Sequence, residues 1–128
     1  MIAAGFGLRA GATLDSLLDA LAQAQEAPAR GPGRDVTVIA APQDKCGHPA
    51  LLALSAQLNM PLTPISDADL RRTETPTQAP RVIEKRGTGS VAEAAALVAA
   101  GPGARMLTGR VISTDRMATC AIAEGDPL

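Results

Sequence analysis

Three segments of the chain carry side chains suited to a ligand with several carboxylates. They are residues 5–12, residues 41–48 and residues 86–93. The candidate binding residues within them are Gly5, Gly7, Arg9, Gly11, Lys45, His48, Gly87, Thr88, Gly89, Ser90 and Glu93. Cations and hydroxyls form hydrogen bonds with carboxylates that are each worth about 1.5–3 kcal/mol when well formed. We therefore predict one ligand-binding edge, provided that the fold brings the three segments together.

The third segment has the pattern of a helix start. Ser90 and Glu93 form the S-x-x-E capping box, in which each side chain accepts a hydrogen bond from a backbone N–H of the first turn. The alanines that follow favour a helix, and Gly101 and Gly103 should end it. A glycine turn that opens onto helical N–H groups also suits an anion. The segment therefore predicts a capped core helix, an anion site, or both.

Other kinds of site fit the sequence less well. Residues 5–11 resemble the dinucleotide fingerprint G-x-G-x-x-G, but the third glycine is one residue late and no acidic residue follows the second expected strand. Cys46 is a candidate nucleophile because Lys45 should lower its pKa, yet no base is fixed near it, whereas Cys120 should be buried packing. Cys46 and His48 alone do not make a zinc site. We expect no metal and no cofactor, and we assign no catalytic residue.

Composition and charge exclude several classes of protein. The 12 Lys and Arg balance 13 Asp and Glu, and Phe6 is the only aromatic residue. The chain therefore lacks the basic field and the stacking aromatics of nucleic-acid-binding proteins. No apolar run approaches the roughly 20 residues of a membrane span, and the N-terminus has no signal sequence. We expect a cytoplasmic protein without nucleic-acid or membrane partners.

Strand and helix patterns alternate along the chain. Strands are expected at residues 2–6, 36–40, 61–65, 82–83, 106–112 and 117–123, and helices after Thr13, from Pro49, at residues 66–70 and after Ser90. The order predicts an α/β fold, a single-domain three-layer sandwich over residues 1–128, with a mixed sheet and a C-terminal antiparallel hairpin. Ligands of such sheets bind beyond the carboxyl ends of the strands, where the three segments should meet, and residues 73–80 should form a mobile loop nearby.

Four stretches carry a family resemblance. They are GFGLRAGA at residues 5–12, the loop around Lys45, GTGSVAEAAAL at residues 87–97 and ATCAIAEG at residues 118–125. Together they resemble the CobE/CbiG C-terminal domain family of cobalamin (vitamin B12) biosynthesis, over nearly the whole chain. The chain departs from the family pattern at His48, where many relatives have glutamate, and at Arg110, where lysine is common.

The resemblance implies a protein that binds a corrin-ring intermediate similar to hydrogenobyrinic acid, as a carrier or accessory. A corrin-ring acid carries carboxylate arms around an apolar rim, which agrees with the cationic edge inferred from the residues. One alternative is a hydrolase or other enzyme acting on a precorrin, because CbiG relatives open a ring lactone; Glu93 and His48 are then the acid–base candidates. The other alternative is an interaction module for another enzyme of the pathway.

Overall fold

The structure is a computed structural model, and it describes residues 1–26, 35–78, 80 and 89–126 of the chain. The elements are β1 (Ile2–Leu8), α1 (Leu14–Glu26), β2 (Val38–Pro42), the 3₁₀ turn η1 (Gln43–Lys45), α2 (Pro49–Leu58), β3 (Leu62–Ile65), α3 (Asp67–Arg72), α5 (Val91–Ala100), β4 (Arg105–Ile112) and β5 (Ala118–Glu124). They form a five-stranded sheet of order β3-β2-β1-β5-β4. β1, β2 and β3 are parallel, and β5 is antiparallel to both β1 and β4.

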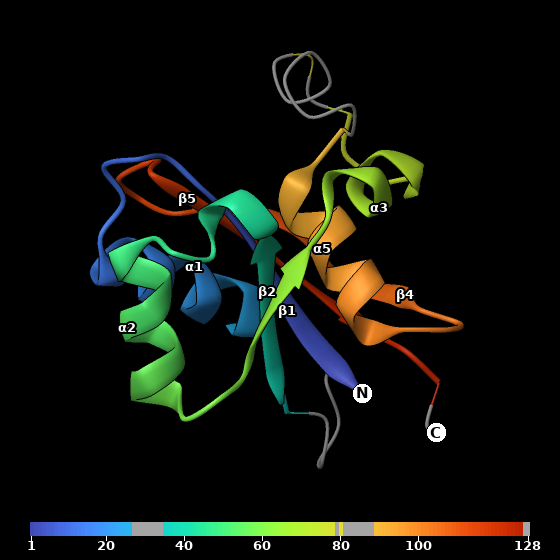
Figure 1. Cartoon of the computed structure of the whole chain (residues 1–128), viewed down its shortest axis with the longest axis horizontal. Helices are drawn as coiled ribbons and strands as arrows, with labels where there is room; N and C mark the ends of the chain where they lie inside the picture. Colours follow the sequence, from blue (N-terminus) through green and yellow to red (C-terminus); the bar gives the residue numbers. More distant parts are fainter. Residues whose placement is uncertain (27–34, 79, 81–88, 127–128) are drawn as a thin grey trace.

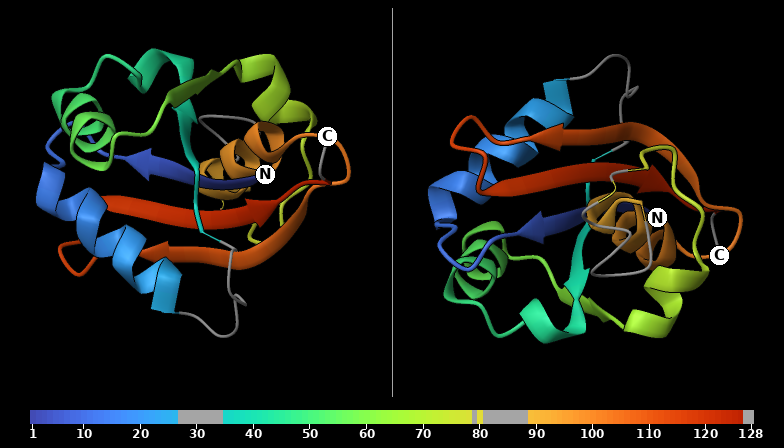
Figure 2. Two further views of the ribbon diagram at one scale, coloured as in Figure 1. Left: turned by 90° about the horizontal axis from the view of Figure 1, so that it is seen from below. Right: turned by 90° about the horizontal axis from the view of Figure 1, so that it is seen from above.

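Helices cover both faces of this sheet. α1 and α2 lie on one face, and α3 and α5 lie on the other (Figures 1 and 2). Alternate residues of β1 point to opposite faces. Phe6 therefore packs in one core cluster with Leu17 and Leu51, whereas Ala3 packs in another with Ala96. The predicted α/β three-layer sandwich, with its mixed sheet and C-terminal hairpin, is confirmed.

β1 continues beyond the expected end at residue 6, so Gly5 and Gly7 are strand residues. A Cβ atom on Gly5 would meet the backbone of Ala92 and Ala96 in α5. The absence of a side chain at Gly5 thus lets α5 lie directly on the centre of the sheet. Ala92 and Ala96 are fully buried there, which explains why this helix is rich in alanine.

The predicted helix ends are confirmed at several places. Thr13 caps α1, because its hydroxyl accepts a hydrogen bond of 3.2 Å from the backbone N–H of Ser16. Ser66, expected as the first residue of a helix over 66–70, instead caps α3, since its hydroxyl accepts from the N–H of Asp69 at 3.2 Å. Gly101 follows α5 with a φ of 89°, a conformation that favours glycine.

The second expected strand is shifted along the chain. β2 begins and ends later than the predicted range 36–40, because the buried apolar run continues to residue 42. The strand expected at residues 82–83 lies outside the described residues. Within the described residues, none of the helices has the length and apolar character needed to cross a membrane.

Candidate functional site

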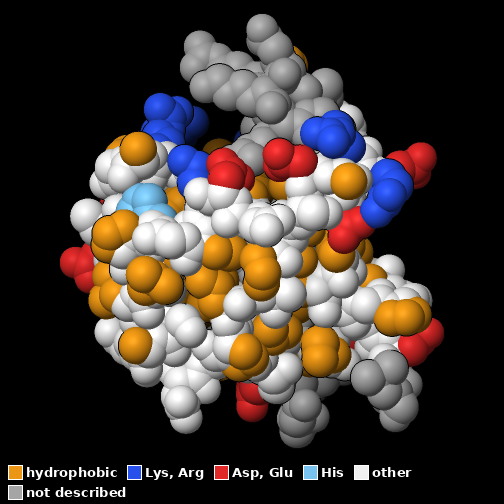
Figure 3. Space-filling model, viewed as in Figure 1, with side chains coloured by type: hydrophobic (Ala, Val, Ile, Leu, Met, Phe, Trp, Pro, Cys, Tyr) orange, Lys and Arg blue, Asp and Glu red, His pale blue; other side chains and the backbone are white. Residues whose placement is uncertain are grey.

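The carboxyl ends of β1, β2 and β3 share the upper edge of the sheet in Figure 1, because these strands are parallel. The β1–α1 loop leaves this edge after Leu8, and η1 follows β2 directly. α5 begins at the same edge, since a Cβ atom on Gly7 would lie 3.7 Å from the side chain of Val91. Lys and Arg side chains gather along this edge together with acidic ones (Figure 3).

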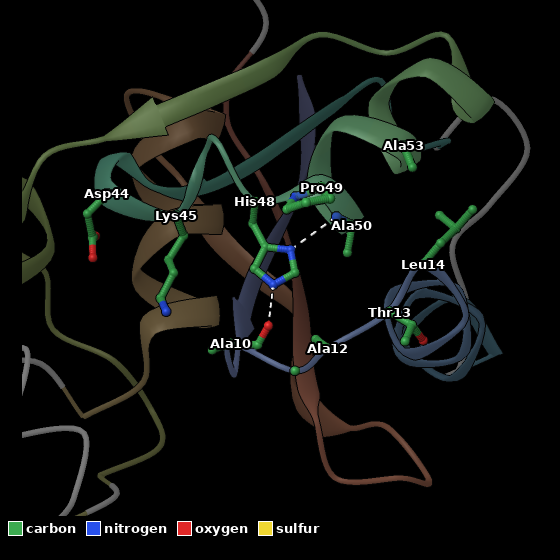
Figure 4. Close-up of a pocket in the computed structure, with 11 residues that line it drawn as sticks. Ala10, Ala12, Thr13, Leu14, Asp44, Lys45, His48, Pro49, Ala50 and Ala53 are labelled. Atoms are coloured by element: carbon green, nitrogen blue, oxygen red, sulfur yellow. Dashed lines mark hydrogen bonds between the residues drawn. The ribbon is translucent and has the colours of Figure 1, made fainter.

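A hollow of about 590 Å³ lies at this edge, between the β1–α1 loop and the start of α2 (Figure 4). Its lining consists of Ala10, Gly11, Ala12, Thr13, Leu14, Asp44, Lys45, His48, Pro49, Ala50 and Ala53. Most of these residues are small and apolar; Lys45 supplies one positive charge and Asp44 one negative charge. We call this feature the Lys45 hollow. It brings together two of the three segments singled out in the sequence, and it contains Gly11, Lys45 and His48 of the candidate residues.

Lys45 ends η1 and is half-buried. Its side chain extends in the same direction as that of His48 (Figure 4). None of the ion pairs among the described residues involves its ammonium group. Within the part of the chain that the structure describes this ammonium forms no ion pair, and at the lining of a largely apolar hollow it is suited to receive a carboxylate from a ligand.

His48 connects the two sides of the hollow. It is the N-cap of α2, and its Nδ1 accepts a hydrogen bond of 3.0 Å from the backbone N–H of Ala50. Its Nε2 lies 2.8 Å from the carbonyl oxygen of Ala10. Both contacts form only in the tautomer that carries the proton on Nε2, which then donates to Ala10. Both ring nitrogens are therefore engaged by the backbone.

The prediction that Cys46 has a lowered pKa is wrong. Burial of the thiol raises the pKa of Cys46, and the nearby charge of Asp44 raises it further. The sulfur lies 3.5 Å from the carbonyl oxygen of Pro42, to which it donates. Cys46 is therefore not activated as a nucleophile. Cys120 is fully buried, as predicted.

Ser90 and Glu93 lie in the interior rather than in the hollow. The Ser90 hydroxyl accepts from the Glu93 N–H at 3.3 Å, which confirms the predicted cap of α5. The return half of the capping box is wrong, because the Glu93 carboxylate bonds elsewhere. It accepts from the N–H of Thr77 at 2.7 Å, from the Thr77 hydroxyl at 2.9 Å and from the N–H of Arg110 at 2.8 Å. We call this buried group the Glu93 anchor.

The Glu93 anchor joins α5, the connection that follows α3 and the edge strand β4. Thr77 belongs to the segment predicted as a mobile loop, and this part of it is hydrogen-bonded to α5. The sequence offered no signal for Thr77, because its segment has no periodicity and lies 16 residues from Glu93. The alternation of inward and outward residues along β4 likewise does not predict that the N–H of Arg110 donates to Glu93.

The other candidate residues lie around these two features. Arg9 is exposed beside the hollow but does not line it, and its N–H donates to the carbonyl oxygen of Met117 at 2.9 Å. Gly89 is buried, and a Cβ atom there would meet the side chain of Gln78. Gly87 and Thr88 lie outside the described residues. The described part of the third segment is thus packed into the fold.

The turn between β4 and β5 is attached to α1, a feature that sequence reasoning missed. The Asp115 carboxylate accepts hydrogen bonds from the hydroxyls of Ser113 and Ser16, both at 2.6 Å. These bonds, with Ser113 as the larger contributor, lower the pKa of Asp115. The Asp19 carboxylate accepts from the N–H of Thr114 at 2.6 Å, and this bond lowers the pKa of Asp19.

Comparison with known proteins places this chain and its fold in a known family. Residues 2–123 match the family described as "Cobalamin synthesis G C-terminus". The crystal structure of CobE, a protein from the cobalamin (vitamin B12) biosynthetic pathway, superposes with a TM-score of 0.83 at 26% identity, covering 96% of this chain and 89% of that one. Cobalamin biosynthesis protein chiG from Agrobacterium tumefaciens gives a TM-score of 0.74 at 30% identity, covering 99% of this chain and 100% of that one.

A third structure shows likeness of fold alone. It is a putative cobalamin biosynthesis protein G homolog from Sulfolobus solfataricus, with a TM-score of 0.71 at 18% identity. The alignment covers 98% of this chain and 37% of that larger one. A search of curated proteins gave no match.

Proposed function

Because the chain belongs to the cobalamin synthesis G C-terminal family, and so is a protein of cobalamin biosynthesis, we propose that it binds a corrin-ring intermediate of this pathway in the Lys45 hollow. In this proposal it acts as a carrier, or as an accessory that presents the intermediate to another enzyme of the pathway. The intermediate is an acid similar to hydrogenobyrinic acid. We also propose that residues 1–128 form a single domain, which the match over residues 2–123 supports.

The observation that carries the proposal is the pairing of Lys45 with an apolar lining. A corrin-ring acid presents carboxylate arms at the rim of an apolar macrocycle. Lys45 lines one side of the hollow, and His48 lies between it and the small side chains of Ala12 and Ala53 (Figure 4). Contact of one ring edge with these alanines would bring an arm to the ammonium group, and Arg9 would meet a neighbouring arm at the exposed side.

The surroundings of three side chains that could act as acids, bases or nucleophiles favour binding over catalysis. Both ring nitrogens of His48 are engaged by backbone groups. The Glu93 carboxylate is fully buried and accepts three hydrogen bonds. The pKa of Cys46 is raised by burial. None of the three combines exposure with a free reactive atom in the described residues, so we propose a binding protein rather than a hydrolase.

An absorbance titration with hydrogenobyrinic acid tests the proposal. We expect the visible spectrum of the corrin ring to change on addition of the wild-type protein. Lys45→Ala should weaken binding about tenfold, the value of one charge-assisted hydrogen bond. Arg71→Ala is the matched control, because Arg71 is an exposed cation of α3 outside the hollow.

Three outcomes would count against the proposal. An unchanged spectrum at high protein concentration would remove it altogether. Equal weakening by Lys45→Ala and Arg71→Ala would show that net charge, and not the hollow, attracts the ring. Multiple-turnover release of acetaldehyde from a lactone-bearing precursor would instead identify a hydrolase.

A further inference from the structure

The β1–α1 loop forms one whole side of the Lys45 hollow, yet no helix or strand includes it. Ala10, Gly11 and Ala12 contribute this side of the lining, and Ala10 and Gly11 are exposed. The shape of the hollow therefore depends on what fixes the loop.

The loop is fixed at its two flanks by different parts of the chain. On the flank towards β5, the N–H of Arg9 donates to the carbonyl oxygen of Met117 at 2.9 Å. Within the loop, the N–H of Ala12 donates to the carbonyl oxygen of Arg9 at 3.0 Å. On the flank towards α2, Nε2 of His48 meets the carbonyl oxygen of Ala10 at 2.8 Å. That contact joins the loop to the segment that carries Lys45.

His48 is held rigidly enough to act as such a link. Its Nδ1 accepts from Ala50, its carbonyl oxygen accepts from the N–H of Leu52 at 3.1 Å, and Pro49 follows it. The imidazole is thus anchored to the first turn of α2 and spans the hollow to reach Ala10 (Figure 4). Besides the packing of α1 against α2, this side chain therefore links the two sides of the hollow directly.

We propose that His48 is a positioning residue, which holds the β1–α1 loop at the distance from Lys45 that the ligand requires. This inference rests on the proposed function for its ligand, but the link between the segments stands on the hydrogen bonds alone. The residue acts through Ala10 and the loop, not by transfer of a proton. Its role is to keep the apolar side of the hollow opposite the ammonium group.

The variant His48→Asn separates the two contacts. Asparagine is a good N-cap, so its side-chain oxygen can still accept from the first turn of α2. It is too short to reach the carbonyl oxygen of Ala10. His48→Ala removes both contacts and serves as the comparison. Because the chain has one histidine, the imidazole nitrogen spectrum of the wild type reports this side chain alone, and we expect a protonated Nε2 and an unprotonated Nδ1.

Two readouts test the role. Amide hydrogen exchange should become about tenfold faster at Ala12 in His48→Asn, and should change less than twofold at Leu52, which reports the cap of α2. The same variant should bind hydrogenobyrinic acid about fivefold more weakly than the wild type, in an absorbance titration. His48→Ala should accelerate exchange at both amides.

The outcomes separate this inference from the proposed function. Unchanged exchange at Ala12 in His48→Asn would overturn the positioning role, whatever the ligand result. Wild-type affinity in a variant whose loop exchanges faster would overturn the role in binding. Faster exchange at Ala12, in a protein whose wild type does not bind the acid, would support the link between the segments and refute the proposed function.

Discussion

The Lys45 hollow and the Glu93 anchor lie at the same edge of the sheet, and each is built around a charged side chain. Glu93 is fully buried, and its carboxylate accepts three hydrogen bonds from residues that the structure describes. Lys45 is half-buried, and no ion pair among the described residues includes it. The sequence suggested one continuous charged edge, but the structure divides it into a buried half around Glu93 and a half that lines the Lys45 hollow.

The difference between Glu93 and Lys45 shows that residue type alone does not decide whether a charged side chain stabilises the fold or is available to a ligand. A charged residue at the edge of a sheet looks the same in the sequence whether it is buried and hydrogen-bonded or accessible. Burial and the supply of hydrogen-bond partners decide whether a charge serves the fold or a ligand. A carboxylate that is already saturated inside the protein offers nothing to a substrate, whereas an open cation beside apolar surface does.

The largest effect is expected for Glu93→Ala. This change leaves the two Thr77 donors and the N–H of Arg110 without their acceptor. These three donors are partly buried, so each lost hydrogen bond should cost about 1 kcal/mol, and the free energy of unfolding should fall by about 3 kcal/mol. Urea unfolding followed by circular dichroism measures the loss.

The control for this change is Glu74→Ala, because Glu74 is exposed and lies in the same connection. It should alter the free energy of unfolding by less than about 0.5 kcal/mol. The folded fraction of Glu93→Ala should still bind hydrogenobyrinic acid with wild-type affinity. A stable Glu93→Ala protein that no longer binds the acid would reverse the assigned roles of the two regions.

A smaller loss of stability is expected for Gly5→Ala. The added Cβ atom would meet the backbone of Ala92 and Ala96, which cannot move as the end of a side chain can. Overpacking of this kind costs about 1–3 kcal/mol. Gly47→Ala is the matched control, since a Cβ atom there has no neighbour within 4 Å. Thermal denaturation of both variants makes the comparison, and equal midpoints would show that α5 does not depend on the glycine.

The smallest effect is expected for Asp115→Asn, and it depends on pH. Hydrogen bonds from Ser113 and Ser16 lower the pKa of Asp115 in the folded chain. Its contribution to stability is therefore present above the ordinary aspartate pKa of about 3.9, and is lost as the pH falls through the lower folded value. Asp115→Asn should lower the melting temperature at pH 7, and the gap from wild type should close in acid.

Calorimetry at several pH values measures this gap, with Asp35→Asn as the exposed control. A gap that stays constant down to acid would mean that the charge of Asp115 does not hold the β4–β5 turn to α1. The turn would then be fixed by the packing of its neighbours alone.

Much of the fold was predictable because local signals agreed with one another. Thr13 and Ser90 marked helix starts, and each of their hydroxyls accepts the expected backbone bond. The alternating apolar runs gave the strands, and the short connection before β5 gave the hairpin. Strand ends were less accurate, because glycine inside β1 was interpreted as a turn when it serves the packing of α5.

The site was predictable only in part. The loops containing Gly11 and Lys45 meet, as expected from the topology of the sheet. The partners of Glu93 and the bridge from His48 to Ala10 depend on tertiary distances that no spacing in the sequence encodes. The pKa of Cys46 was misjudged for the same reason, since burial of the thiol and the charge of Asp44 both raise it.

The most direct test of the division between the two regions is a map of backbone amide shifts during titration with hydrogenobyrinic acid. We expect the largest changes at residues 10–14 and 44–53, around the Lys45 hollow, with little change at Thr77 and Arg110. Shifts centred on Thr77, Glu93 and Arg110, with residues 10–14 unaffected, would contradict the account.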